Sequence, residues 1–281
     1  MNNEVKYIEA LGADFSPPDL RDYKIEKSSL SSEFPEEFTL EMPPVKNQGS
    51  VSSCVAHSIC LVAEYYNFIQ HNINVPLSVG YIYGNRVFPL KEGKGMVTRY
   101  AISNFCVDGT PFESEFPLHC EVPEIIEAVQ KQKDSLHNDA RNARFTSYVK
   151  VSSEKEIKTA LMNGNPVIIA VDWQKDMKVK DGKFHSSWKE KSSGHAMVIY
   201  GWDKNGWKVQ NSWGISWGNK GTAVWPYEYK IRELYAIIDT ETTKLNIKHP
   251  YSTKTKFGRW LVALVNKVYS IVYSIVYKIK Q

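Results

Sequence analysis

The chain has 281 residues, of which 42% are hydrophobic and 23% charged, as is ordinary for a soluble globular protein with one large or two modest domains. Its net charge of +4 hides an asymmetry, because eight lysine and arginine residues and no acidic residue follow Glu241. Subtracting these eight leaves about −4 on residues 1–241. The charge therefore does not indicate a nucleic-acid-binding body.

The first 40 residues are polar and rich in turn formers, which predicts an extended lead-in without a helix of its own. Residues 1–5 lack the apolar core of a secretory signal, so we expect none to be cleaved. The chain has four cysteines, Cys54, Cys60, Cys106 and Cys120. If one is a nucleophile, the other three cannot pair completely. This count favours the cytoplasm or another reducing compartment without structural disulfides.

The first half of the chain predicts helices. One begins just after Ser52-Ser53 and continues with apolar residues at spacings of three and four up to Ile69. A second is expected over residues 97–105, closed by Asp108-Gly109. Residues 120–147 are polar with little periodicity, which predicts a surface insertion.

The second half changes from helix to strand. A short helix is predicted over residues 154–162, stopped by the turn residues 163–166. Strands separated by turn signals are predicted at 166–171, 195–202, 206–210, 222–225 and 236–239. The sequence thus indicates an α+β protein, helical first and antiparallel β later.

Three distant segments carry the groups that cysteine-dependent acyl transfer needs. Cys54 would be the nucleophile, at a predicted helix start where the helix dipole favours a thiolate. His195 would act as general base and acid, with Asn211 bonded to its other ring nitrogen. Gln48 could offer its side-chain amide, with the backbone N–H of Cys54, to an oxyanion. This chemistry requires no metal and no cofactor.

Each of these residues also has a plain structural interpretation. A cysteine near a helix start is more often a small buried apolar residue. A histidine in an apolar strand is usually a core histidine, and residues 211–214 could form a turn with a packing tryptophan. The order, separation and local context of the four candidates together are more specific than any one of them.

The joint pattern resembles the papain-like cysteine peptidases, the C1 family. The matching segments, spread over roughly residues 10–240, are Pro44–Gly49, Ser53-Cys54, Ala56, Ser58, Leu77–Tyr81, Gly194–Ala196, Asn211–Gly214 and Trp217-Gly218. In that family the histidine and asparagine follow the cysteine by about 130–150 residues. Here His195 follows Cys54 by 141 residues and Asn211 follows it by 157.

The resemblance implies a papain-like two-lobe fold of the α+β class. It has a helical left lobe, an antiparallel β-barrel-like right lobe and the active-site cleft between them. It assigns to Cys54, His195, Asn211 and Gln48 the roles given above. It also implies that Trp213 shields the histidine–asparagine hydrogen bond and that the backbone of Gly95 pairs with a substrate peptide.

Several residues near the candidate nucleophile depart from the family pattern. Val51 stands where the family usually has a disulfide-forming cysteine, and Ser52 and Val55 replace a glycine and a tryptophan. His57 stands where an aromatic residue is common, and packing in the helix is its plain role. These changes around the candidate nucleophile motivate an alternative function, a catalytically silent papain-like module that binds a peptide or partner protein. Related acyl transfers such as transpeptidation would use the same groups.

We therefore predict a cysteine endopeptidase, similar to compact microbial or viral members, that hydrolyses peptide or protein substrates through a thioester acyl-enzyme. The predicted organisation is a lead-in at 1–40, a peptidase domain at 41–241 and a tail at 242–281. The lead-in is expected to clasp the body or partly cover the cleft. No nucleic-acid partner is predicted, and the oligomeric state stays open.

The tail carries a mostly apolar run from Trp260 to Tyr277, flanked by positive charges. As a helix its 18 residues would span about 27 Å, near the lower limit for crossing a bilayer. Lys267 near its middle would cost roughly 2.5–3.5 kcal/mol in lipid. The favoured hypothesis is a membrane anchor, spanning or interfacial. The alternatives are a helix that docks on a partner or a second copy, and a strand hairpin or disordered extension.

Overall fold

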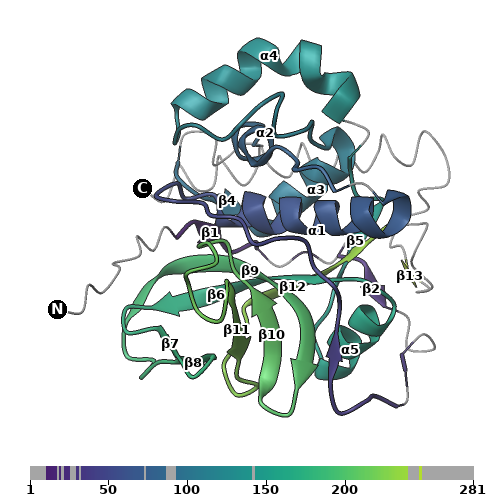
Figure 1. The fold of residues 1–281 in the computed structure, drawn as a ribbon, viewed down its shortest axis with the longest axis vertical. Coiled ribbons are helices and arrows are strands. Elements are labelled where there is room, and N and C mark those ends of the chain that lie inside the picture. Colours follow the sequence, from purple (N-terminus) through teal and green to yellow (C-terminus); the bar gives the residue numbers. More distant parts are fainter. Residues whose placement is uncertain are drawn as a thin grey trace.

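The computed structural model describes residues 11–17, 19, 22–25, 30–31, 33–72, 74–86, 93–140, 143–239 and 247–248. The elements form a mainly helical half and a mainly β half, with helix α1 between them (Figure 1). The helices are α1 (Cys54–His71), α2 (Val79–Gly84), α3 (Thr98–Asp108), α4 (Glu124–Ala140) and α5 (Glu154–Met162). The strands are β1 (Ala13–Asp14), β2 (Lys24–Ile25), β3 (Phe38–Thr39), β4 (Met96–Val97), β5 (Ser147–Lys150), β6 (Val167–Gln174), β7 (Lys178–Lys180), β8 (Lys183–His185), β9 (Lys191–Asp203), β10 (Gly206–Gln210), β11 (Thr222–Trp225), β12 (Glu233–Ile238) and β13 (Ile247–Lys248).

Helix α1 is the buried element that joins the two halves. Every residue from Cys54 to Tyr66 is buried, because apolar side chains occur around the whole helix rather than on one stripe. The helix ends at Asn72, which has a left-handed backbone (φ 56°) and whose N–H bonds the carbonyls of Asn67 and Phe68. Burial along this length fixes the first residue, Cys54, at the boundary between the halves.

The β half is one sheet with strand order β5-β12-β6-β9-β10-β11-β8-β7, and β3 also pairs with β9. All of these pairings are antiparallel except β11 with β8. The long strand β9 is paired on both sides, with Val171 of β6 opposite His195. Because His195 lies within the stretch of β9 that pairs with β6, its position is set by the sheet and not by a loop.

The α+β, two-lobe architecture predicted from the sequence is confirmed, and so are its main elements. Helix α5 has the predicted bounds, and a capping box between Ser153 and Glu156 starts it. Helix α3 runs three residues beyond the predicted end and stops at Gly109 (φ 65°). The predicted strands correspond to β6, β9, β10, β11 and β12, whereas β5, β7 and β8 were not predicted.

The prediction of a surface insertion at residues 120–147 is wrong. Most of that segment is helix α4, with Ile125, Ile126, Val129 and Leu136 buried. These few apolar residues form one narrow stripe that packs on α2, where a Cβ on Gly84 would lie 2.5 Å from the side chain of Val129. The stripe is too sparse to stand out among the charged residues around it.

The structure bears on the predicted lead-in and on the predicted tail in different ways. Strand β3, within the predicted lead-in, pairs with β9, so this part of the lead-in belongs to the sheet. In the described part of the chain no helix has the length and apolar character needed to cross a bilayer. The apolar run at 260–277, on which the membrane prediction rests, lies outside the described residues.

Candidate active site

Cys54 is the first residue of α1 and has no exposed surface. Ser53 occupies the N-cap position, but its side chain bonds the imidazole of His57 and not a backbone N–H of the helix. The uncapped amides and the helix dipole both favour an anion at this end. The structure therefore places the predicted nucleophile at the end of the helix whose dipole favours an anion.

His195 and Asn211 are hydrogen-bonded as predicted, with 2.8 Å between Nε2 and Oδ1. The same Asn211 oxygen accepts the N–H of Ser212 at 2.8 Å, which identifies it as the acceptor end of the amide. Nε2 of His195 must therefore carry the proton, which leaves Nδ1 as the basic nitrogen of the neutral ring. Nδ1 is buried and has no hydrogen-bond partner among the described residues.

Aromatic rings enclose the imidazole. Trp213, for which the resemblance implies a shielding role, stacks on His195 with ring centroids 4.5 Å apart. Trp173 contacts both rings edge-on, at 5.1 Å from His195 and 4.9 Å from Trp213. The sequence prediction missed Trp173, which reaches the site because β6 pairs with β9. These rings keep water away from the hydrogen bond to Asn211 and hold the ring plane of His195.

Gln48 lies beside the same segment. Its backbone N–H bonds the Ser212 carbonyl at 2.8 Å, and its side-chain oxygen accepts the Ser212 hydroxyl at 2.5 Å. Its side-chain nitrogen donates to the Val51 carbonyl at 2.9 Å. The loop that leads into Cys54 thus fixes the orientation of the Gln48 amide.

The lead-in lies across Cys54 and His195. The carbonyl of Gly12 accepts the Met96 N–H at 2.8 Å, and its N–H donates to the Gly194 carbonyl at 3.1 Å. Strand β1 then pairs in parallel with β4, on the helical side of the site (Figure 1). A Cβ built on Gly194 would lie 1.8 Å from the Ala13 carbonyl oxygen, so the two backbones touch.

Charged side chains hold the lead-in beyond this crossing. The ring of Phe15 lies 4.7 Å from the Lys191 ammonium and 4.6 Å from the Arg232 guanidinium. Both cations also bind Asp172, at 2.5 and 2.9 Å. This arrangement packs an aromatic side chain of the lead-in against the rim of the β lobe.

A second anchor lies on the helical side. The guanidinium of Arg99, only 3% exposed, forms ion pairs with Asp19 at 2.9 Å and Asp22 at 3.4 Å. Lys150 approaches Asp22 to 3.2 Å. The lead-in is therefore fixed at several points on both lobes, as the sequence-based expectation of a clasp or cover requires.

Burial changes the pKa values of both candidate catalytic groups. Burial raises the pKa of the Cys54 thiol from 9.0 to about 12, although backbone hydrogen bonds from Ala196 and Gly12 oppose it. This shift corresponds to roughly 4 kcal/mol in favour of the neutral thiol, more than the ~2 kcal/mol that a helix dipole supplies at best. Burial likewise lowers the pKa of His195 to about 4, although the hydrogen bond that His195 donates to Asn211 opposes it. In the covered site both groups are neutral at pH 7.

One residue that departs from the family pattern, His57, lies close to Asn211. The imidazole of His57 is buried, and its Nδ1 bonds the Ser53 carbonyl at 3.1 Å. Its role here is packing in α1, beside a cavity of about 10 Å³ that Lys46 and Asn211 also line. Among the described residues no group of three or more histidine, cysteine, aspartate or glutamate side chains is arranged to hold a metal.

A cysteine at a helix start and an imidazole oriented by an amide, between a helical and a β lobe, define the thiol-dependent hydrolases of papain-like fold. The family model described as papain family cysteine protease matches residues 35–230, so the chain belongs to that family.

Relatives and solved structures agree with this membership. The chain is 28% identical over 199 residues to an uncharacterized peptidase C1-like protein of Acanthamoeba polyphaga mimivirus, covering 65% of this chain and 64% of that protein. It is 25% identical to cathepsin O of Mus musculus, covering 64% and 58%. The chain thus spans less than two thirds of the length of these relatives. The fold resembles xylellain, a cysteine protease from Xylella fastidiosa, with a TM-score of 0.71, 22% identity and coverage of 85% and 100%.

Proposed function

We propose that the protein is a cysteine peptidase that hydrolyses peptide bonds through a thioester on Cys54. The observation that carries this proposal is the hydrogen bond of 2.8 Å from His195 to Asn211. This hydrogen bond leaves Nδ1 of His195 as the base. Cys54 lies at the start of α1, and its thiol interacts with the backbone of Ala196, the residue that follows His195 in β9. A silent binding module has no need for an imidazole held in this tautomer.

In the first half of the reaction, Nδ1 of His195 takes the proton from the Cys54 sulfur. The sulfur then forms a bond to the carbonyl carbon of the peptide, and the carbonyl electrons move onto oxygen. That oxygen accepts hydrogen bonds from the Gln48 amide and the Cys54 backbone N–H. When the C–N bond breaks, the imidazolium gives its proton to the leaving amine, and a thioester remains.

In the second half, Nδ1 of His195 removes a proton from water, and the resulting hydroxide attacks the thioester carbon. The oxyanion again accepts hydrogen bonds at the same place. When the C–S bond breaks, the carboxylic acid leaves and Cys54 recovers its proton from the imidazolium. Each proton that His195 removes is thus returned, so the enzyme ends each cycle unchanged.

The closed arrangement described above is a latent form of this enzyme. The lead-in occupies the backbone groups on both sides of Cys54, and burial keeps thiol and imidazole neutral. Displacing residues 11–15 would hydrate both groups and let a proton pass from sulfur to nitrogen. An extended peptide could then take the place of the lead-in along β4.

Two measurements separate this proposal from the silent module. Cys54→Ser should abolish both peptide hydrolysis and labelling by a thiol-directed peptidyl epoxide. Cys60→Ser, which alters another buried thiol of α1, should retain both. Wild type and a variant with a displaced lead-in should differ in labelling rate. If neither hydrolyses peptides nor reacts with the epoxide, the chain is a binding module.

Endopeptidase action, membrane association and a reducing location remain proposals supported by the sequence alone. Positions of cleavage within a peptide library, read by mass spectrometry, distinguish internal from terminal cleavage. Liposome flotation of the full chain against a chain that lacks residues 252–281 tests the membrane proposal. Loss of flotation on truncation supports an anchor, whereas equal flotation of both contradicts it.

A further inference from the structure

Two backbone segments on the helical side of the cleft are far apart in sequence but must keep a fixed separation. One is the loop of residues 51–53 before Cys54. The other is the segment from Gly93 to Val97. Within it the N–H of Met96 binds the carbonyl of Gly12, a residue of the lead-in that lies across the site. No disulfide joins them, because all four cysteines are free.

A chain of hydrogen bonds connects the two segments. The carboxylate of Glu121 accepts the Ser52 backbone N–H at 2.8 Å and, with its other oxygen, the hydroxyl of Tyr83. The oxygen of that hydroxyl accepts the Gly95 backbone N–H at 3.2 Å. Donors therefore point from both ends toward one carboxylate, an arrangement in which each bond polarises the next.

The charge state of the bridge is settled by its surroundings. Burial disfavours the charged form of Glu121, but hydrogen bonds from Tyr83, Ser52 and Val122 outweigh it and lower the pKa of this carboxyl. Burial raises the pKa of Tyr83 to about 12. The phenol is therefore the donor and the carboxylate the acceptor throughout the neutral pH range.

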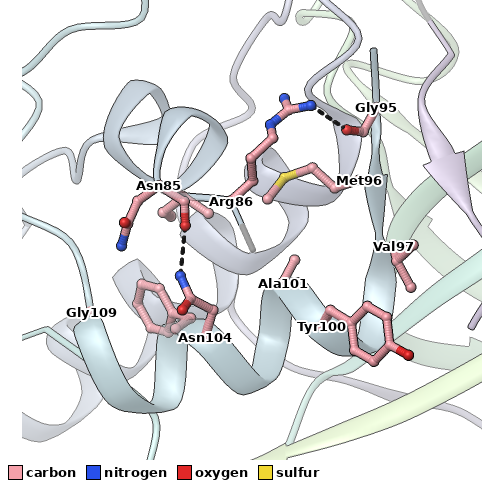
Figure 2. A pocket seen from close by; sticks show the side chains of 11 residues that line it. Asn85, Arg86, Gly95, Met96, Val97, Tyr100, Ala101, Asn104 and Gly109 are labelled. Carbon is pink, nitrogen blue, oxygen red and sulfur yellow. Dashed lines mark hydrogen bonds between the residues drawn. The ribbon is translucent and has the colours of Figure 1, made fainter. Parts of the chain in front are cut away.

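Arg86 strengthens the same connection. Its guanidinium lies over the Tyr83 ring at 4.1 Å and donates to the carbonyl of Gly95 at 2.8 Å and also to that of Gly93. Figure 2 shows this side chain extended toward Gly95 beside a cavity of about 20 Å³. These polar tethers therefore hold the segment before β4 in addition to the packing of the buried Met96 and Val97.

We propose that Tyr83 and Glu121 are positioning residues that fix the distance between the nucleophile loop and the peptide-pairing strand. They touch neither the thiol nor the peptide. They act by holding the backbone of Ser52, near the nucleophile Cys54, and the backbone of Gly95, next to the peptide-pairing residue Met96. The proposal rests on the peptidase function proposed above, and it predicts that peptides bind and react less well when the bridge is cut.

The first test measures hydrogen exchange in the full chain, in peptides that cover residues 50–53 and 93–97. Tyr83→Phe removes only the hydroxyl, and Glu121→Gln removes the charge. Each should speed exchange at least tenfold in both segments, because the bridge couples them. Tyr81→Phe is the matched control, since its buried hydroxyl has no hydrogen-bond partner among the described residues. If each variant affects only the segment it contacts, the bridge does not couple them.

The second test uses kinetics. In a variant whose lead-in is displaced, Tyr83→Phe should raise KM for a peptide substrate at least fivefold, with a smaller change in kcat. Iodoacetamide should alkylate Cys54 at the same rate with and without Tyr83→Phe in that variant. Slower alkylation together with lower kcat would mean that the variant damages the thiol site itself. Hydrolysis that survives Cys54→Ser would refute the peptidase proposal, and the exchange experiment would still decide whether the bridge exists.

Discussion

The backbone N–H of Gly12 donates a hydrogen bond of 3.1 Å to the carbonyl of Gly194, the residue before His195. On its other side Gly12 accepts from Met96, so a single residue spans the cleft next to the nucleophile. A Cβ on Gly12 would lie 2.2 Å from the Ser52 carbonyl oxygen, well inside van der Waals contact. Only a glycine fits at this point of the closed form.

Gly12→Ala should therefore displace the lead-in without altering any group of the proposed catalytic site. We expect alkylation of Cys54 by iodoacetamide to accelerate at least tenfold, equivalent to about 1.4 kcal/mol of lost closure. Peptide hydrolysis should rise with it. Gly93→Ala is the control, because a Cβ there meets nothing within 4 Å among the described residues. Equal alkylation rates in the wild type and Gly12→Ala would show that residues 11–15 do not limit access.

Gln48→Ala tests the oxyanion role in the same Gly12→Ala background. Loss of one preorganised donor should lower kcat by about 10²-fold with little change in KM, since the donor acts mainly on the developing charge. Gln210→Ala removes a buried amide that bonds the Pro43 carbonyl and should leave kcat within about threefold. A thermal melt of both variants checks that the fold survives. Unchanged kcat in Gln48→Ala would remove this residue from the mechanism.

The sequence was sufficient to propose Cys54, His195, Asn211 and Gln48 as site residues, because each has a local motif and a chemical reason for its residue type. Trp173 was out of reach, since its contact with His195 arises from the pairing of β6 with β9 and from no nearby pattern. The hydrogen bonds of Gly12 to Gly194 and Met96 could not be predicted from the sequence either. A glycine in a polar lead-in carries no signal of what its backbone touches.

Lys46 and Glu64 form a largely buried ion pair at 2.6 Å that ties the segment before Gln48 to α1. Burial disfavours the charged lysine, but the nearby Cys60, Glu64 and Glu113 outweigh it and raise its pKa. Lys46→Met should destabilise the protein by about 3–5 kcal/mol, because it leaves the Glu64 carboxylate buried without its cation. Urea unfolding monitored by tryptophan fluorescence measures the change.

A second variant shows whether the uncompensated charge is the cause. Lys46→Met combined with Glu64→Gln removes both charges while keeping an acceptor for the Leu77 N–H, which Glu64 binds at 2.7 Å. The double variant should recover most of the stability lost in the single one. If the double variant is as unstable as Lys46→Met alone, lost packing and not the buried charge explains the effect.

His57 and His195 make the fold sensitive to acid. Burial is the main cause that lowers the pKa of both imidazoles from 6.5 to about 4, and Lys46 adds to the effect at His57. Because these pKa values are depressed in the folded state, their contribution to stability is complete above pH 6.5 and is lost as the pH falls through about 4. Each group can account for up to roughly 3 kcal/mol over that window.

His57→Gln removes one of the two buried titrating rings and keeps a side chain that can bond the Ser53 carbonyl. The free energy of unfolding, measured in urea at several values between pH 7 and pH 4, should fall less steeply with acid than in the wild type. His185→Gln alters an exposed imidazole and should reproduce the wild-type slope. If His57→Gln and His185→Gln have the same slope, protonation of His57 does not drive the loss of stability in acid.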